Sequence, residues 1–260
     1  MKLAAGAGAA AAASGFVLSD FLRNLSRTYA ASPNSGRNSR RWVMVIDLAR
    51  CNGCKKCTEW CVTEHKVPPA WGNPSYNGYQ EWIAVVQTSN DPENAAPFRP
   101  TPCMNCMNAP CVKVCPVGAT YYNDENLVVV DNVRCIGCRF CMAACPYDRR
   151  FFNWGEPPHT PDERFINYTP DFPVLHTKGT VEKCNWCSHR ARMGRLPACV
   201  EACRNEGMNA IFFGDANEDV ITNGEEIFSL SKILASRGGY RFMEELGTEP
   251  SLYYLPPTGK

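Results

Sequence analysis

The 260-residue chain lacks the motifs by which many enzymes bind nucleotides or activate a nucleophile. It has no G-x-G-x-x-G sequence, no phosphate-binding P-loop and no nucleophile elbow. Histidine is scarce, and a lone histidine is more often a surface or packing residue than a catalytic base. The four histidines, His65, His159, His176 and His189, are isolated in the sequence. We therefore expect no substrate-converting site in this chain and assign no catalytic residue.

An excess of charge of one sign is also missing. Lysine and arginine number 27 and aspartate and glutamate 26, which leaves a formal net charge of +1. The basic residues are not gathered in one stretch, so the chain has no electrostatic footprint of nucleic-acid binding. We therefore expect no nucleic-acid partner.

A long, strongly apolar segment is lacking as well. The N-terminal run to Leu18 is rich in alanine and glycine, and it is too short and too weakly apolar for a span of roughly 20 residues. It is typical of an export signal and resembles the twin-arginine type, although no arginine pair precedes Lys2-Leu3. Either the true start lies upstream or a partner subunit carries the signal; the alternative is an alanine-rich helix packed on a partner. We expect a membrane-associated protein on the periplasmic face, with the cytoplasmic face as the alternative.

Cysteine, in contrast, is abundant. The sixteen cysteines fall into four groups of four, with none left over. The first and third groups match the C-x2-C-x2-C-x3-C run of bacterial ferredoxins, in which three thiolates hold one [4Fe–4S] cluster and the fourth reaches a neighbouring cluster. The groups are Cys51, Cys54, Cys57 and Cys61; Cys103, Cys106, Cys111 and Cys115; Cys135, Cys138, Cys141 and Cys145; and Cys184, Cys187, Cys199 and Cys203.

Two other uses of cysteine compete with iron–sulfur binding. A disulfide framework suits small secreted domains, whereas 260 residues that are 45% hydrophobic can form a core without it. Structural zinc binds pairs of C-x2-C type, and this alternative stays open for the fourth group, whose two pairs are well separated. The proline after Cys115 and after Cys145 repeats the C-P ending of the ferredoxin motif. We therefore predict four [4Fe–4S] clusters.

Apolar periodicity and turn residues predict short elements around the cysteine groups. A strand feeds the first group, a helix carries its last cysteine, and Pro68-Pro69 ends that helix. The predicted strands lie at 41–47, 81–87, 179–183 and 210–214, the helices at 54–65 and 224–237, a hairpin between Cys115 and Cys135, and an extended tail at 253–257.

The order of the groups indicates an internal duplication. One ferredoxin unit, built from the second and third groups, lies within a second unit that is split between the first and fourth. The predicted fold class is α+β, a duplicated two-[4Fe–4S] ferredoxin fold with loop insertions. Its segments are a leader and linker (1–39), the split outer unit (40–66 and 180–223), an insertion (67–102), the inner unit (103–146), a second insertion (147–179), and a C-terminal helix and tail (224–260).

Four ferredoxin motifs in this order, the opening I-D-L-A-R-C-N-G-C and the closing K-C-x2-C-x11-C-x3-C together resemble one family. It comprises the iron–sulfur subunits of molybdopterin oxidoreductases of the dimethyl sulfoxide reductase and polysulfide reductase type. The resemblance covers residues 41–256, and it implies that the last cysteine of each group crosses to a partner group. The implied ligand sets are Cys51, Cys54, Cys57 and Cys203; Cys61, Cys184, Cys187 and Cys199; Cys103, Cys106, Cys111 and Cys145; and Cys115, Cys135, Cys138 and Cys141.

Two details bear on these ligand sets. Some relatives lack one cysteine of the second group and carry a [3Fe–4S] centre there, but Cys106 occupies that position here, so we retain four [4Fe–4S] clusters. Cys203 is followed by Arg204 instead of a proline, so we expect a different local turn at this ligand. Trp60 and Trp186 lie beside ligands. We interpret them as shields that keep water from a cluster, and a role as electron relays is the less favoured alternative.

The resemblance implies an electron-transfer subunit of an oxidoreductase complex in a respiratory chain. Its partners would be a large catalytic subunit containing molybdopterin and an integral membrane subunit that reacts with quinone. Two alternatives are the iron–sulfur subunit of a non-molybdenum complex of the alternative complex III type and that of a periplasmic hydrogenase. A free-standing polyferredoxin is a further alternative. We interpret the basic residues near the ligands together as compensation for cluster charge, while a solvated face is the favoured alternative for any single one; they are Lys55, Lys56, Lys113, Arg134, Arg139 and Lys183.

Overall fold

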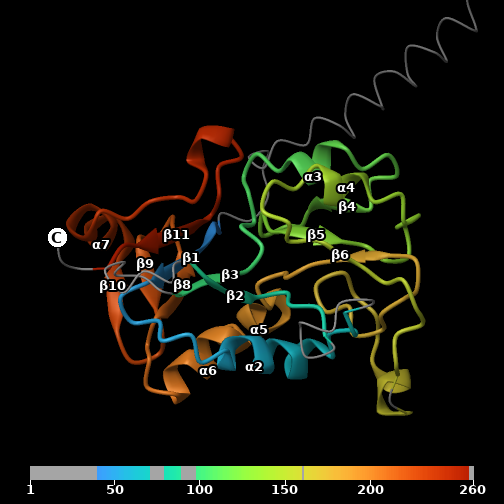
Figure 1. Ribbon diagram of the computed structural model, residues 1–260, viewed down its shortest axis with the longest axis horizontal. Helices are drawn as coiled ribbons and strands as arrows, with labels where there is room; N and C mark the ends of the chain where they lie inside the picture. The colour runs from blue at the N-terminus through green and yellow to red at the C-terminus, as the bar shows by residue number, and fades with distance from the viewer. Residues whose placement is uncertain (1–39, 71–78, 89–97, 160, 258–260) are drawn as a thin grey trace, which may run out of the picture. The chain divides into compact units, whose positions relative to one another are not determined.

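The computed structural model describes residues 40–70, 79–88, 98–159 and 161–257, which Figure 1 draws as a coloured ribbon. Short helices alternate with short strands, and the strands form several small sheets. The fold is therefore mixed α+β, as predicted. The predicted leader at 1–39 and parts of the first predicted insertion lie outside the described residues. The predicted domain boundaries stay predictions.

The largest sheet has five strands in the order β10-β9-β8-β1-β11 (Figure 1). Its strand β1 (Trp42–Asp47) pairs antiparallel with β8 (Ile211–Asp215) and parallel with β11 (Leu252–Leu255). The strands β9 (Val220–Thr222) and β10 (Ile227–Ser229) continue the antiparallel part. The strand predicted before the first cysteine group and the strand predicted after the last group are thus confirmed. The predicted extended tail forms β11, which pairs with β1 of this chain.

The two faces of β1 contribute to different hydrophobic clusters, because successive residues of a strand point to opposite faces. Val43 and Val45 belong to a cluster with residues of α7 (Leu230–Arg237). Met44 and Ile46 belong to the larger core that also contains most of the buried cysteines. An uninterrupted apolar run is what a strand buried on both faces requires. Strand β1 therefore links the cysteine-bearing core to the C-terminal part of the sheet.

The C-terminal helix begins later than predicted. Strand β10 and the turn before it occupy the first part of the predicted helix at 224–237, and α7 begins only at Leu230. Ser229 is the N-cap, and its hydroxyl accepts a hydrogen bond from the backbone N–H of Lys232. The helix ends at Gly238 with a φ of 63°, where the sequence predicted its end. The error arose because the apolar pattern does not reveal that residues 227–229 pair with β9.

Smaller sheets connect the remaining segments. The predicted strand at 81–87 is shortened to β2, and the predicted strand at 179–183 is shortened to β7. The predicted hairpin is confirmed as an antiparallel pair. The three two-stranded pairs are β2 (Ala84–Gln87) with β3 (Phe98–Thr101), β4 (Thr120–Tyr122) with β5 (Val128–Val130), and β6 (Phe151–Phe152) with β7 (Val181–Glu182).

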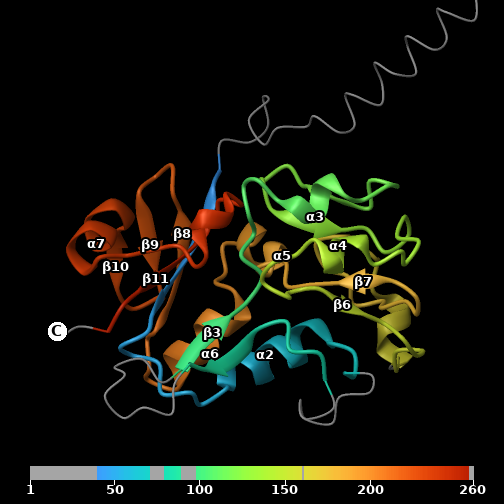
Figure 2. The same ribbon diagram turned by 45° about the horizontal axis from the view of Figure 1, so that its top comes forward.

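Five short helices accompany the cysteine groups. The predicted helix at 54–65 is α2 (Lys56–His65), which ends in a left-handed Lys66 before the two prolines. Figure 2 shows α2 beside α6 (Ala198–Asn205) and, apart from these two, α3 (Pro110–Lys113) beside α4 (Phe140–Ala143). The fifth is α5 (Ser188–Arg192). In the part of the chain that the structure describes, α2 is the longest helix, at ten residues, and no helix is long and apolar enough to cross a membrane.

Candidate iron–sulfur centres

The first and third cysteine groups lie in loops with the same backbone conformation. Gly53 and Lys55 in the first loop have φ values of 80° and 60°, and Gly137 and Arg139 in the third have 69° and 62°. A side chain at Gly137 would place its Cβ only 2.1 Å from the carbonyl oxygen of Gly179, so glycine is required there. The two loops therefore turn alike, although more than 80 residues separate them.

Cys51, Cys54, Cys57 and Cys203 line one hollow. Cys57 lies on α2 and Cys203 on α6, so the packing of these two helices brings the first and fourth groups together. The backbone N–H of Ala210 lies 3.2 Å from the Cys203 Sγ and donates to it. We call these four cysteines quartet A. They are the residues that the family resemblance assigns to one cluster.

The turn at Cys203 differs from those at Cys115 and Cys145, as expected from the residue that follows. Cys115 and Cys145 each lie beyond a four-residue helix and precede a proline. Cys203 lies within α6, which continues through Arg204 to Asn205. Proline has no N–H and ends a helix, whereas arginine permits two further helical residues.

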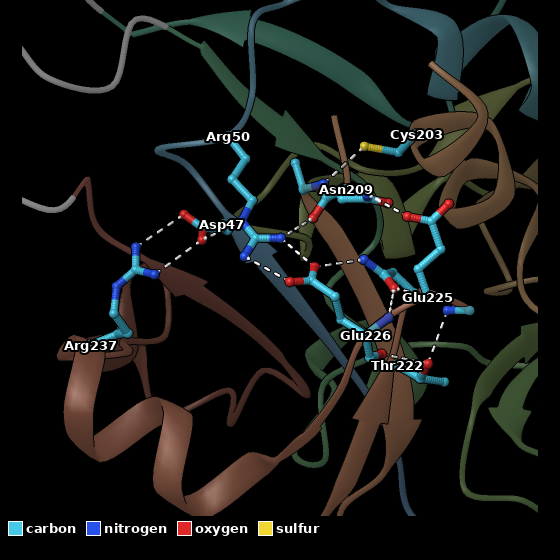
Figure 3. A network of polar contacts seen from close by, with 11 residues as sticks. Asp47, Arg50, Cys203, Asn209, Thr222, Glu225, Glu226 and Arg237 are labelled. Atoms are coloured by element: carbon cyan, nitrogen blue, oxygen red, sulfur yellow. Dashed lines mark hydrogen bonds and ion pairs between the residues drawn. The ribbon is translucent and has the colours of Figure 1, made fainter. Parts of the chain in front are cut away.

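A network of polar side chains surrounds the loop before quartet A (Figure 3). Arg50 donates to the carboxylate of Glu226. It also donates, at 3.2 Å, to the carbonyl oxygen of Asn209, the residue before Ala210, whose N–H donates to Cys203. Buried Asp47 pairs with both Arg50 and Arg237. The network therefore fixes the first cysteine loop to the β9–β10 turn and to α7.

Cys61, Cys184, Cys187 and Cys199 form quartet B, and all four are buried. Burial raises the pKa of Cys61 well above its ordinary range, and the nearby thiolates of the other three raise it further. The cysteines come from α2, from the loop between β7 and α5, and from α6. Quartet B is therefore the only one of the four sets with no cysteine near solvent.

The inner part of the chain brings together two further sets. In quartet C, burial raises the pKa of Cys106, and the thiolates of Cys103, Cys111 and Cys145 raise it further. In quartet D, four cysteines line a second hollow, and the backbone N–H of Thr120 donates to Cys115 Sγ at 3.4 Å. The members of quartet D are Cys115, Cys135, Cys138 and Cys141.

The four quartets follow one another in the order A, B, C, D. The thiolate of Cys57 in quartet A lies close enough to Cys61 in quartet B to raise its pKa. The indole N–H of Trp186, which lies between two quartet B cysteines, donates to the carbonyl oxygen of Cys103 in quartet C at 2.8 Å. Trp186 is fully buried, in agreement with a shielding role, whereas Trp60 is 38% exposed.

Arg150 is the buried cation between quartets C and D. Its side chain is 2% exposed, and Nη1 donates to Thr120 Oγ1 at 3.1 Å. Burial opposes the charged form, but the thiolates of Cys111 and Cys141, one from each quartet, outweigh it and raise the pKa of Arg150. Sequence reasoning missed this residue, because Arg149 beside it carries the same charge and is only partly buried.

The basic residues singled out in the sequence have other partners. Lys56 pairs with Glu59, and Arg134 pairs with Asp131. Arg139 lies over the rings of Phe152 and Trp154. Lys113 donates to Asn108, Lys183 donates to the carbonyl oxygen of Cys184, and Lys55 is an exposed residue of the first loop. The charge of Lys183 favours the thiolate of Cys184, in line with charge compensation, and Arg150 and Arg50 act in the same way on thiolates of other quartets.

The histidines are not all isolated, which corrects the sequence interpretation. The rings of His65 and His189 lie 5.2 Å apart, and Nε2 of His176 lies 2.9 Å from the carbonyl oxygen of His65. His65 Nε2 lies 3.1 Å from the Sγ of Cys187. Only His159, which pairs with Glu163, remains apart from this group. No sequence signal predicts the cluster, since His65 and His176 are 111 residues apart.

The donor sets fit iron–sulfur clusters. Cysteine ligands must be thiolates, and burial raises the pKa of Cys184 to about 11, so the buried sites favour ionised sulfur only when positive charge is bound. Backbone N–H groups point at several sulfurs, which is typical of cluster sites. Among the described residues, no three or more His, Cys, Asp or Glu side chains are arranged to hold a single metal ion.

Comparison with known proteins gives consistent matches. Residues 95–159 and 172–214 match the family described as a 4Fe-4S dicluster domain. A dimethyl sulfoxide reductase iron–sulfur subunit from Halobacterium salinarum is 40% identical over 82% of this chain and 78% of its own length. A selenate reductase subunit from Mesobacillus selenatarsenatis is 39% identical over 84% of this chain and 73% of its own length.

The chain belongs to the iron–sulfur subunits of the dimethyl sulfoxide reductase and polysulfide reductase type. The menaquinone reductase iron–sulfur cluster-binding subunit of Nitratidesulfovibrio vulgaris is a further relative, 39% identical over 83% of this chain and 88% of its own length. As a member of this family, the chain is an electron-transfer subunit that binds several [4Fe–4S] clusters. Iron–sulfur binding thereby replaces the zinc alternative.

Proposed function

We propose that this iron–sulfur subunit relays electrons through four [4Fe–4S] clusters between a catalytic subunit and a quinone-reactive membrane subunit. The observation that carries the proposal is the placement of the two exposed cysteines. Cys54 belongs to quartet A and Cys138 to quartet D, which are the two ends of the series, whereas quartet B is wholly buried. A relay between two partners requires surface contact at each end and an insulated middle.

The ligand assignment forms part of this proposal. Each quartet supplies the four thiolates that a [4Fe–4S] cluster needs, and when bound the clusters exchange single electrons. The chain contributes thiolates, backbone N–H donors and a dry environment, which set the potentials. The same left-handed turns in the first and third loops support the duplicated fold, in which the inner ferredoxin unit lies within the split outer one.

Partners and location extend the proposal. Exposed apolar residues lie in the hollow of Cys138 and next to it in the chain, which favours contact with another protein at that end. The name of the Nitratidesulfovibrio relative, a menaquinone reductase subunit, supports a quinone-linked partner here. We propose a molybdopterin-containing catalytic partner and a periplasmic, membrane-associated location reached by twin-arginine-type export. The exposed residues are Val117 and Ile136, which line the hollow, and Phe140, which follows Cys138 by two residues.

Metal analysis of the complex, purified anaerobically through this chain, tests the proposal. We expect about 16 iron atoms per chain, the content of four [4Fe–4S] clusters, together with molybdenum or tungsten. Nickel in place of molybdenum would identify the hydrogenase alternative, and iron alone an alternative complex III type partner or a free carrier. Zinc without iron would overturn the proposal.

A further inference from the structure

His65 lies against the most buried of the four quartets. It is the last residue of α2, the helix that also carries Cys61, and its side chain is buried. Its Nε2 lies 3.1 Å from the Sγ of Cys187, within hydrogen-bond distance. The ring packs between Trp82 and His189, with centroids 5.2 Å away on each side. The imidazole is thus held in place against a proposed cluster ligand.

The surroundings of the ring determine which nitrogen carries the hydrogen. The buried ring has an acceptor for a hydrogen on only one of its nitrogens, so it carries a single N–H and is neutral. Nδ1 is buried and has no hydrogen-bond partner among the described residues. A thiolate ligand has no hydrogen to donate, so the hydrogen resides on Nε2. His65 therefore donates to Cys187, and Nδ1 is a bare acceptor.

A second histidine positions the first. The Nδ1 of His176 lies 2.9 and 2.8 Å from the two carboxylate oxygens of Glu182, and its Nε2 lies 2.9 Å from the carbonyl oxygen of His65. With acceptors on both sides, both ring nitrogens of His176 are donors. Burial opposes this charged form, but Glu182 outweighs it and raises the pKa of His176. Asn132 donates to Glu182 at 2.8 Å and holds the carboxylate in turn.

His176 lies at the C-terminal end of α2, where its Nε2 satisfies a terminal carbonyl group and where the helix dipole favours the protonated ring. The contact is to the backbone of His65 itself. A shift of His176 would move the residue whose ring reaches Cys187. Glu182, His176 and His65 form a continuous polar chain that ends on the sulfur.

We propose that His65 is a positioning and tuning residue of electron transfer, whose Nε2–H donates to Cys187 and raises the reduction potential of the cluster bound by quartet B. The inference rests on the proposed binding of a [4Fe–4S] cluster by these four cysteines. Reduction adds one negative charge to the cluster and its thiolates. A hydrogen-bond donor to a ligand sulfur stabilises the more negative state, so the potential rises.

EPR-monitored redox titration of the intact complex tests this inference. In His65→Phe we expect one of the four midpoint potentials to become more negative by a tenfold change in the equilibrium constant, about 59 mV for a one-electron couple. In His65→Gln the amide N–H can replace Nε2–H, so the potential should return towards the wild-type value. The affected centre should be the one whose signal changes in Cys187→Ser. The matched control His159→Phe should leave all four potentials unchanged.

A measurement on the wild-type complex tests the same inference without requiring that a variant folds. With ¹⁵N-labelled histidine, pulsed EPR should detect a weak coupling to the histidine nitrogen on a single reduced centre, and His65→Gln should abolish it. The absence of this coupling, or four unchanged potentials in His65→Phe with full iron content, would overturn the inference. Neither result would affect the proposed relay, which fails only if the wild-type chain lacks iron–sulfur clusters.

Discussion

Quartet B and the inner quartets C and D hold their thiolates in different electrostatic environments. Quartet B has four buried cysteines and a neutral imidazole, that of His65, against Cys187. Quartets C and D share the buried guanidinium of Arg150, which carries a full charge. A dipole acts over a short distance, whereas a charge also acts on more distant groups. One environment therefore affects a single cluster, and the other affects two.

The secondary structure that carries quartet B also differs from that which carries the inner quartets. Quartet B is built on α2 and α6, of ten and eight residues, and Glu64 of α2 pairs with His189 and Arg190 of α5. The inner quartets are built on two four-residue helices and the β4–β5 hairpin. Short helices bury little surface, so the inner part depends more on its bound clusters and on Arg150.

Loss of a ligand gives the largest expected contrast. Cys199→Ala and Cys138→Ala should each lower the iron content from about 16, by one atom where a [3Fe–4S] centre forms and by four where the cluster is lost. Cys199 lies in the interior on α6, so its variant should also lose folded protein, whereas Cys138 is exposed and its variant should remain folded. Iron content and circular dichroism of both variants measure the difference. Equal stability of the two would contradict the contrast between buried and exposed sites.

Removal of the shared charge comes next. Arg150→Met leaves the buried thiolates of two quartets without their cation, a change that costs about 3–5 kcal/mol. We expect two midpoint potentials to fall together, where His65→Phe lowers one. Thermal unfolding followed by cluster absorbance and a redox titration measure these effects. Arg134→Met, whose side chain is 64% exposed, is the control and should change neither.

The residue that follows Cys203 gives a further comparison with the inner part, where a proline follows Cys145. Arg204→Pro introduces proline within α6, removes a helical hydrogen bond, and should cost about 3 kcal/mol. The reverse change in the inner part, Pro146→Ala, should cost less, because Pro146 lies outside α4. Melting temperatures of the two variants test this order. A stable Arg204→Pro variant would mean that α6 can end at Cys203, as the inner helices do at their ligands.

The smallest effect is expected at the ion pair between α2 and α5. Hydrogen bonding from His189, together with Arg190, lowers the pKa of Glu64 to about 2 against the effect of burial. Glu64→Gln should cost about 1 kcal/mol. Since the folded pKa lies below the ordinary value, this contribution is fully present from pH 5 to 8 and is lost only as the pH falls towards 2. Glu59→Gln, an exposed change on the same helix, is the control in the thermal unfolding series.

Much of the site could be predicted from the sequence because its signals are local. The spacing of the cysteines specified loops, and the apolar run at 42–47 specified β1. The lack of proline after Cys203 correctly indicated a different turn. These features depend on residues close together in the chain, and cysteine has few roles that require four at such spacing.

The residues that distinguish the quartets could not be predicted in this way. His65 and His176 meet only after α2 packs against the segment before β7, so the separate histidines gave no indication of a group. Arg149 and Arg150 are adjacent and identical, and only the fold determines which one is buried. The local pattern of residues 227–229 predicts a helix. In the structure these residues pair with β9 as a strand, and this pairing outweighs the local preference.

The parallel pairing of β11 with β1 has a consequence for biosynthesis. Strand β1 leads directly into the loop of quartet A, and its partner β11 reaches residue 255. The outer quartets need cysteines up to position 203 and a sheet completed by β11, whereas the cysteines of the inner quartets and Arg150 all lie within residues 103–150. On the ribosome the inner quartets are therefore complete about 100 residues before the sheet beside quartet A can close, at the ordinary rate of synthesis a delay of roughly 5–20 s. Assembly factors that deliver iron and sulfide thus meet a chain whose middle is ready first.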